Sequence, residues 1–307
     1  MQKPYQDVIV EGKWESLEEF LDDDEAFSMA YPRMTVAKDT AFHIAVHSKS
    51  EQPLKNLLER VANYDEHIRA NVLNPTNAHE TTDLHEAAIN HVGDGYFTDD
   101  HMNFDRMIMI TNLLNTTNAY ENTVLHEAAI NHNIEAVKLL VEGRPVTPAH
   151  WLFEEERCYV TPLQLLERNK SGQTPLFKAA AFGSTKVVKY LASRPNQTSD
   201  KQLEGAHRIN NDGFSILHAA VRGEHFGTAL ELLKLDEGLA ELKTKDGMTS
   251  LHLLTNLRSA FTNKFSDHLW HRLLYHCIPT GDDNYDDADN IFDSEVNPSP
   301  QGNIGKG

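Results

Sequence analysis

The sequence predicts an all-α fold, a solenoid of helix-turn-helix repeats joined by short hairpin loops, and three observations lead to this class. The segment Asn118 to His132 (NAYENTVLHEAAINH) repeats almost letter for letter the segment Asn77 to His91 (NAHETTDLHEAAINH), 41 residues earlier. The pattern Thr-x-Leu-His-x-Ala-Ala inside these segments returns in varied form along the chain. Apolar residues at helical spacing follow the copies. Repetition at such a period indicates a stack of similar units.

Each position of this pattern has a physical role. Thr or Ser at the first position can cap a helix by accepting a hydrogen bond from a free N–H of the first turn, and Pro175 at the second position has no N–H to leave unpaired. The paired alanines allow close packing of neighbouring helices. We expect the histidines at the fourth position to bind backbone groups of adjacent repeats. The copies begin at Thr40, Thr82, Thr123, Thr174, Ser215 and Thr249, and the histidines are His43, His85, His126, His218 and His252.

The chain divides into three predicted parts. Residues 1–39 are expected to form a capping half-repeat and a loop, residues 40–278 the repeats, and residues 279–307 an acidic tail that has too few apolar residues to fold. The spacing between copies varies from 34 to 51 residues, so insertions are expected near 92–105 and 143–170. The sequence therefore predicts about seven units, counting the half-repeat.

Hairpin turns are predicted before three of the copies. Gly172, Gly213 and Gly247 stand two residues ahead of the first signature residue. A tight turn needs a positive φ angle at that place, which glycine adopts without steric cost.

The composition limits the classes of partner and compartment. A net charge of −18 argues against non-specific binding to nucleic acid or to an anionic membrane surface. The two cysteines, Cys158 and Cys277, cannot make a disulfide framework, and a reducing compartment suits them. No signal peptide and no run of 18 apolar residues is present, so the sequence predicts a soluble cytoplasmic chain with no direct membrane span and with protein partners.

The sequence predicts no catalytic residue, no metal site and no cofactor. His85 and His126 open a pattern like that of zinc proteases, but Ile89 and Ile130 stand where the second histidine ligand would be. The acidic tail carries Asp287 where a calcium loop requires glycine. No phosphate-binding loop and no nucleophile elbow occurs.

The repeated pattern resembles the T-P-L-H-x-A-A signature of ankyrin repeats. The resemblance implies a concave groove lined by the exposed residues of the first helices and the tips of the hairpin loops. We expect this groove to bind a partner protein, with Tyr120 and Phe182 as the main anchors. The predicted groove residues are Ile44, His47, Glu86, Ile89, Asn90, Glu127, Ile130, Asn131, Lys178, Ala181, Phe182 and Arg222, and the tip residues are His79, Glu80, Tyr120 and Glu121.

Three segments are similar to a narrower family, the plant ankyrin-repeat membrane proteins with a C-terminal Pro-Gly-Gly domain. The segments are Val10 to Ser16, Lys170 to Ala180, and Asp246 to Leu254 together with Ser259 to Phe261. The resemblance implies an adaptor in defence or stress signalling, at the cytosolic face of the plasma membrane if a longer form exists. This sequence ends without the Pro-Gly-Gly domain. A regulatory domain or truncated form of a transporter-like or channel-like membrane protein, and a targeting subunit of an enzyme, are the alternatives.

Overall fold

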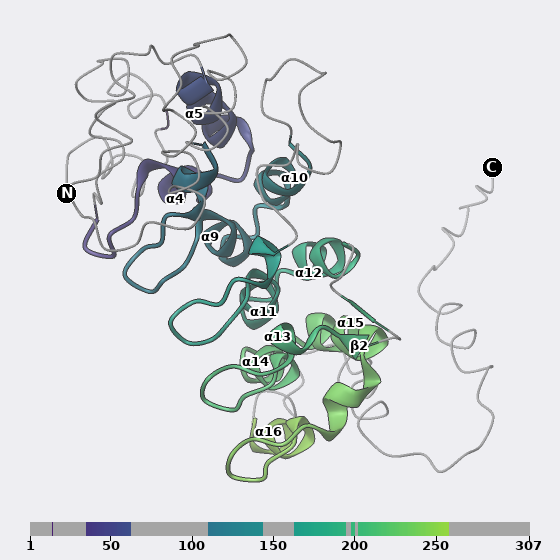
Figure 1. The fold of residues 1–307 in the computed structure, drawn as a ribbon. Helices are drawn as coiled ribbons and strands as arrows, with labels where there is room; N and C mark the ends of the chain where they lie inside the picture. Colours follow the sequence, from purple (N-terminus) through teal and green to yellow (C-terminus); the bar gives the residue numbers. More distant parts are fainter. Residues whose placement is uncertain are drawn as a thin grey trace, which may run out of the picture. The chain divides into compact units, whose positions relative to one another are not determined.

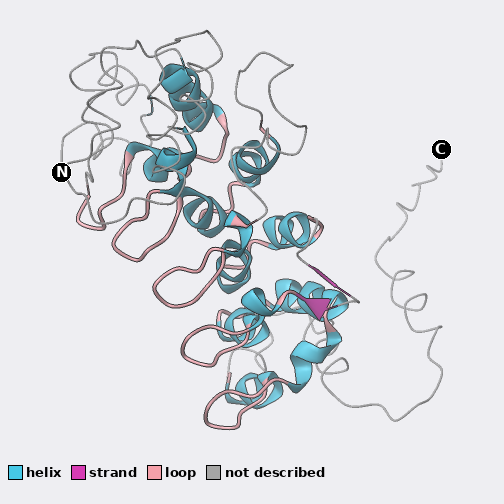
Figure 2. Ribbon diagram, in the orientation of Figure 1, coloured by secondary structure: helices cyan, strands magenta, loops and turns pink. Residues whose placement is uncertain are grey.

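The computed structural model describes residues 14, 35–62, 110–143, 163–194, 198–199 and 202–257, and these are mainly helical (Figures 1 and 2). They all belong to Met1–Cys277, one of the two units into which the chain divides; the other is Ile278–Gly307. Several sequence predictions fall outside the described residues: most of the N-terminal cap, the repeat at Thr82, the 92–105 insertion, most of the 143–170 insertion and the tail.

The helices form two sets. The first set follows the signature residues and comprises α4 (Ala41–Ala45), α9 (Val124–Ile130), α11 (Pro175–Ala181), α14 (Ile216–Arg222) and α16 (Ser250–Asn256). The second set comprises α5 (Gln52–Ala62), α10 (Ile134–Glu142), α12 (Thr185–Ala192) and α15 (Phe226–Leu235), and residues 110–115 are also helical. The other elements are η3 (Gln164–Leu166), α13 (Gly205–Arg208), η4 (Glu237–Glu241), and the paired strands β1 (Thr198–Ser199) and β2 (Gln202–Leu203).

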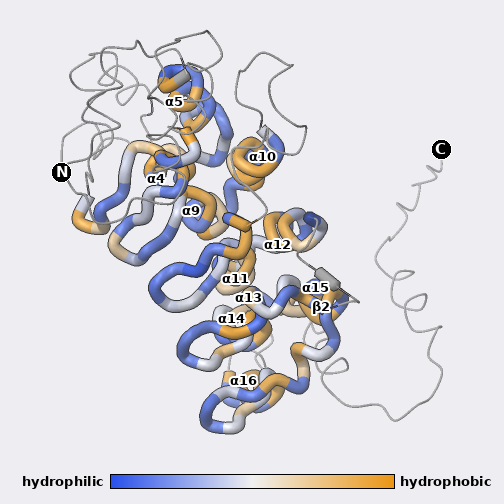
Figure 3. Tube along the Cα trace, in the orientation of Figure 1, coloured by the Kyte–Doolittle hydropathy of each residue, from blue (hydrophilic) through white to orange (hydrophobic). Residues whose placement is uncertain are grey.

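The two sets pack as successive layers of a repeat stack. In the first set α4 contacts α9, α9 contacts α11, α11 contacts α14, and α14 contacts α16; in the second set α10 contacts α12, and α12 contacts α15 (Figure 1). Large side chains such as Phe42, Phe177 and Leu217 fill the interior, and Ala128 and Ala179 are fully buried between neighbouring helices. Figure 3 shows hydrophobic residues concentrated in the helices and hydrophilic residues in the hairpin loops. The predicted ankyrin-type, mostly helical fold is confirmed.

The signature histidines join consecutive repeats. Nε2 of His43 lies 3.0 Å from the carbonyl oxygen of Asn122, Nε2 of His126 lies 2.9 Å from that of Gln173, and His218 makes the same contact 3.0 Å from Met248 O. Nδ1 of each ring accepts the backbone N–H of the signature Thr or Ser. The proton therefore resides on Nε2, and each imidazole is neutral. The bonds agree with the role that the sequence predicts for these histidines.

The repeat at Thr174 has no signature histidine, and a residue from another segment takes its place. Phe177 occupies the fourth position and is fully buried. Oγ1 of Thr174 lies 2.8 Å from Nδ1 of His207, which is also fully buried and belongs to α13. The insertion between α12 and α14 thus supplies the missing imidazole from 33 residues away. Nothing in the spacing of the signature predicts this contact.

The hairpin loops ahead of the first helices are tied together by backbone hydrogen bonds. Ala119 N–H donates to Ala37 O at 2.7 Å, Lys170 N–H to Tyr120 O at 3.1 Å, and Asn211 N–H to Ser171 O at 3.0 Å. The positive φ angles predicted for the three turn glycines are confirmed, at 72° for Gly172, 84° for Gly213 and 77° for Gly247; Lys38 (61°) and Glu121 (58°) hold the same place in two other loops.

Gly172→Ala is expected to destabilise the protein by about 1–2 kcal/mol, because a Cβ costs this much in the left-handed region. The new Cβ would also meet the side chains of Asn211 and Arg168. Glu121→Gly, at the equivalent turn position, is expected to change stability in the opposite direction by a few tenths of a kcal/mol up to about 1. Urea unfolding followed by circular dichroism measures both. A Gly172→Ala variant as stable as the native chain would refute the proposed strain.

Helix α4 packs directly on α9, although the signature residues Thr40 and Thr123 that precede these helices lie far apart in the sequence. Asn133 joins the same two parts of the chain, because its Nδ2 lies 3.2 Å from Val46 O and 3.0 Å from Ser50 O while its Oδ1 caps α10 at 2.9 Å.

Candidate partner-binding surface

The exposed residues of α4, α9, α11 and α14, with the hairpin loops that precede these helices, form what we call the first-helix surface. Tyr120 at a loop tip is 62% exposed and Phe182 at the end of α11 is 43% exposed. His47 and Arg222 are exposed, and Lys178 is half-buried. Asn131, Ile130 and Ala181 are half-buried and Glu121 is exposed, whereas Glu86, Ile89, Asn90, His79 and Glu80 lie outside the described residues.

Two predicted groove residues do not face solvent. Ile44 is 1% exposed because its helix packs directly against α9, which makes it part of the core. Glu127 is 8% exposed. Both positions are usually exposed in ankyrin repeats, which is why the sequence predicts solvent-facing side chains there. For Ile44 and Glu127 this prediction is wrong.

Glu127 is the centre of a buried polar network. Its Oε1 accepts hydrogen bonds from Nδ2 of Asn118 at 2.9 Å and from Nδ2 of Asn122 at 2.8 Å. Its Oε2 lies 3.8 Å from Nε2 of His47. Nδ2 of Asn169, in the next loop, donates to Oδ1 of Asn122 at 2.7 Å. The network holds three successive loops and helices in register, so Glu127 supports the surface from within and does not offer its carboxylate to a partner.

Two cations of this surface lie over aromatic rings. Nζ of Lys178 is 5.4 Å from the centroid of the Phe182 ring, and Cζ of Arg222 is 5.7 Å from that of Phe214. Burial lowers the pKa of Lys178, and the charge of Glu127 opposes this shift. The Phe214 ring also meets His218 edge to face at 6.1 Å. Packing with the rings therefore fixes both cationic side chains in place.

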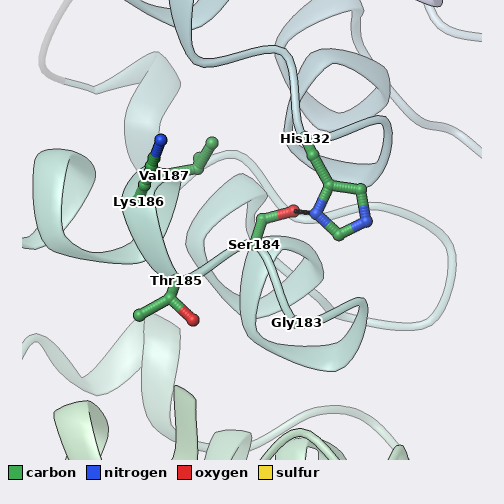
Figure 4. A pocket seen from close by; sticks show the side chains of 6 residues that line it. All are labelled: His132, Gly183, Ser184, Thr185, Lys186 and Val187. Atoms are coloured by element: carbon green, nitrogen blue, oxygen red, sulfur yellow. Dashed lines mark hydrogen bonds between the residues drawn. The ribbon is translucent and has the colours of Figure 1, made fainter. Parts of the chain in front are cut away.

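A pocket beside the turn between α11 and α12 holds the pair Ser184 and His132 (Figure 4). Oγ of Ser184 lies 2.6 Å from Nδ1 of His132, but its single proton is donated to Ala129 O at 2.8 Å. Nδ1 of His132 must therefore be the donor, and the imidazole cannot accept the serine proton. Ser184 is also 3% exposed. The pair joins two repeats and is not arranged as a nucleophile with its base.

Within the described ranges no group of three or more His, Cys, Asp or Glu side chains is placed to hold a metal ion. None of the helices described is both long and apolar enough to span a bilayer.

Comparisons with known proteins agree with this architecture. A family model described as "Ankyrin repeats (3 copies)" matches residues 102–202 and again residues 149–246. Residues 102–246 thus match ankyrin repeats, which as a class are protein-interaction modules that are generally not catalytic. It is similar to Protein ACCELERATED CELL DEATH 6 of Arabidopsis thaliana, with 31% identity over 144 residues. The match covers 45% of this chain and only 20% of the relative's length.

Proposed function

We propose that the chain is a non-catalytic adaptor that binds a partner protein through the first-helix surface. The observation that carries the proposal is the exposure of Tyr120 and Phe182, two large aromatic side chains that folding leaves outside the core on the same surface as Arg222. Aromatic and arginine side chains contribute most of the free energy at protein interfaces. The ankyrin class supports the same reading, because repeat scaffolds bind through surfaces built from successive units.

We further propose that the adaptor acts in a plant signalling process connected with cell death and defence, from a cytoplasmic location. The similarity to Protein ACCELERATED CELL DEATH 6 of Arabidopsis thaliana supports the connection with cell death in a plant. Because this chain matches only a fifth of that protein, the whole relative's activity does not transfer with the similarity.

Affinity capture tests the adaptor proposal. The native chain is compared with a variant that carries Tyr120→Ala, Lys178→Glu, Phe182→Ala and Arg222→Glu, after circular dichroism shows that both are folded. We expect a partner that the native chain retains and the variant loses. The control carries Lys55→Glu, Leu163→Ala and Lys186→Glu, at positions exposed outside this surface, and should retain the partner. Equal recovery by all three proteins would show that partners bind elsewhere.

The second candidate is a cytosolic regulatory domain of a longer membrane-embedded protein. One observation favours it: the ankyrin match occupies only part of a longer relative. An antibody raised against residues 163–194 would then detect a larger species in the membrane fraction of source cells, released by detergent and not by high salt. A species of the size of this chain in the soluble fraction would count against the candidate.

A further inference from the structure

Two neighbouring units of the stack present the same combination of groups. Lys178 and Phe182 belong to α11, Arg222 ends α14, and Phe214 precedes α14 by two residues. Helices α11 and α14 pack side by side. Each unit therefore offers one cation held over one aromatic ring, at 5.4 Å and 5.7 Å from the ring centroid. We call these four residues the cation–aromatic pairs.

Neither cation pairs with a carboxylate among the described residues. In the parts of the chain that the structure describes, no carboxylate oxygen lies within 4.0 Å of Lys178 or Arg222. Glu127, which contributes to the field at Lys178, is already bound to two asparagine amides. Three lysines of the second helices, Lys138, Lys189 and Lys234, do lie within 4.0 Å of a glutamate. In a chain of net charge −18, positive charge without a partner on a candidate interface is a complementary site for an acidic group.

The chemistry of the cation–aromatic pairs limits the class of ligand further. A carboxylate can form charge-assisted hydrogen bonds with both an ammonium and a guanidinium group. Phe182 is 43% exposed and offers apolar area next to the ammonium group of Lys178. A ligand that satisfies both groups carries acidic and apolar side chains close together. Nucleic acid and anionic lipid fit less well, because the net charge of −18 repels an extended polyanion.

We infer that the cation–aromatic pairs recognise a short acidic peptide segment of the partner, in which Asp or Glu residues lie next to apolar residues. The inference rests on the proposed adaptor function and specifies the class of partner sequence. Lys178 and Arg222 bind the carboxylates, and Phe182 contacts the apolar side chain. Ionic strength then governs the affinity, since exposed ion pairs are screened by salt.

Peptide display on the full chain provides the test. A random twelve-residue library is panned against the native protein, and the most enriched peptide is labelled and titrated by fluorescence anisotropy. We expect Asp and Glu to be enriched beside Leu, Ile, Phe or Tyr. Binding should weaken about tenfold or more with Lys178→Glu/Arg222→Glu, which corresponds to about 1.4 kcal/mol or more. The same loss should follow when the Asp and Glu residues of the peptide are replaced by Asn and Gln, and affinity should fall as salt rises.

A control variant distinguishes the effect of the charge at this site on affinity from the effect of the net charge of the chain. Lys55→Glu/Lys186→Glu changes the net charge by the same amount on the second helices α5 and α12, and it should leave affinity within about twofold of the native value. Peptides without acidic residues, or acidic peptides that bind the Lys178→Glu/Arg222→Glu variant as tightly as the native chain, would overturn the inference. Selected peptides lost only with Tyr120→Ala would leave the adaptor function standing and refute the acidic class. A panning without any enriched peptide also counts against the inference, while the capture experiment judges the adaptor function separately.

Discussion

Replacing Asp236 by alanine is expected to lower the free energy of unfolding by about 3 kcal/mol or more, because it removes one partner of a buried ion pair. The Asp236 side chain is fully buried at the end of α15. Its Oδ2 lies 3.4 Å from Nε of Arg208 and accepts a hydrogen bond from the N–H of Leu203 at 3.1 Å. The alanine variant leaves the guanidinium group of Arg208 without its counter-ion and the buried N–H of Leu203 without its acceptor. Arg208 is 23% exposed and can regain part of its hydration, which places the effect at the lower end of the usual range.

Two further variants test this account of Asp236 by urea unfolding at neutral pH. Arg208→Met/Asp236→Ala is expected to be less destabilised than the sum of its single variants, because no unpaired charge remains. Lys138→Ala removes the exposed contact with Glu135 at 3.3 Å and should cost less than about 0.5 kcal/mol. If Asp236→Ala were as mild as Lys138→Ala, the pair would have no structural importance.

Much of the fold follows from local sequence. A capping residue, an apolar stripe and a glycine in a turn each determine the conformation of nearby residues, and α9, α11 and α14 begin directly after Thr123, Thr174 and Ser215. These signals act over a few residues, so they can be read from a single chain. The same holds for the histidine bonds, because Asn122, Gln173 and Met248 each stand one residue before a signature Thr and present their carbonyl group to a histidine.

Contacts that depend on three-dimensional order could not be read in this way. The contact between the repeats that begin at Thr40 and Thr123 depends on Asn133 reaching carbonyl groups 83 and 87 residues away. His207 is a second case, because its short helix α13 lies outside the repeat period.

The candidate surface was predictable only in outline. The exposure of three side chains could be predicted from their positions in the repeat: Tyr120, Phe182 and Arg222. Burial of Glu127 does not, because it results from two asparagine side chains of the preceding loop that converge on one carboxylate oxygen. A polar residue at a repeat position that is usually exposed is predicted to face solvent unless the positions of its neighbours are known. The sequence therefore distinguishes helix faces better than it distinguishes binding groups from supporting groups.

The buried histidines are expected to make the protein less stable in mild acid. Burial lowers the pKa of His126 from 6.5 to about 4 and that of His207 from 6.5 to about 4. For His126, the charge of Lys178 acts in the same direction, as does that of His43 once this ring is protonated, and the bond to Gln173 O opposes them. The unfolded chain therefore binds more protons than the folded chain between these values. Stability from the neutral rings is fully present above about pH 6.5 and is lost as the pH falls toward 4.

Between pH 7 and pH 5, each of the two rings should reduce the free energy of unfolding by about 2 kcal/mol, or about 4 kcal/mol together. Urea unfolding of the full chain at both pH values measures the loss. His126→Gln and His207→Gln should each be less stable than the native chain at pH 7, yet each should lose about 2 kcal/mol less on acidification because one titrating ring is gone. His252→Gln removes a similar cap contact to Thr249 from an exposed ring and serves as the control. If all four proteins lost the same free energy, protonation of His126 and His207 could not be the cause of the loss.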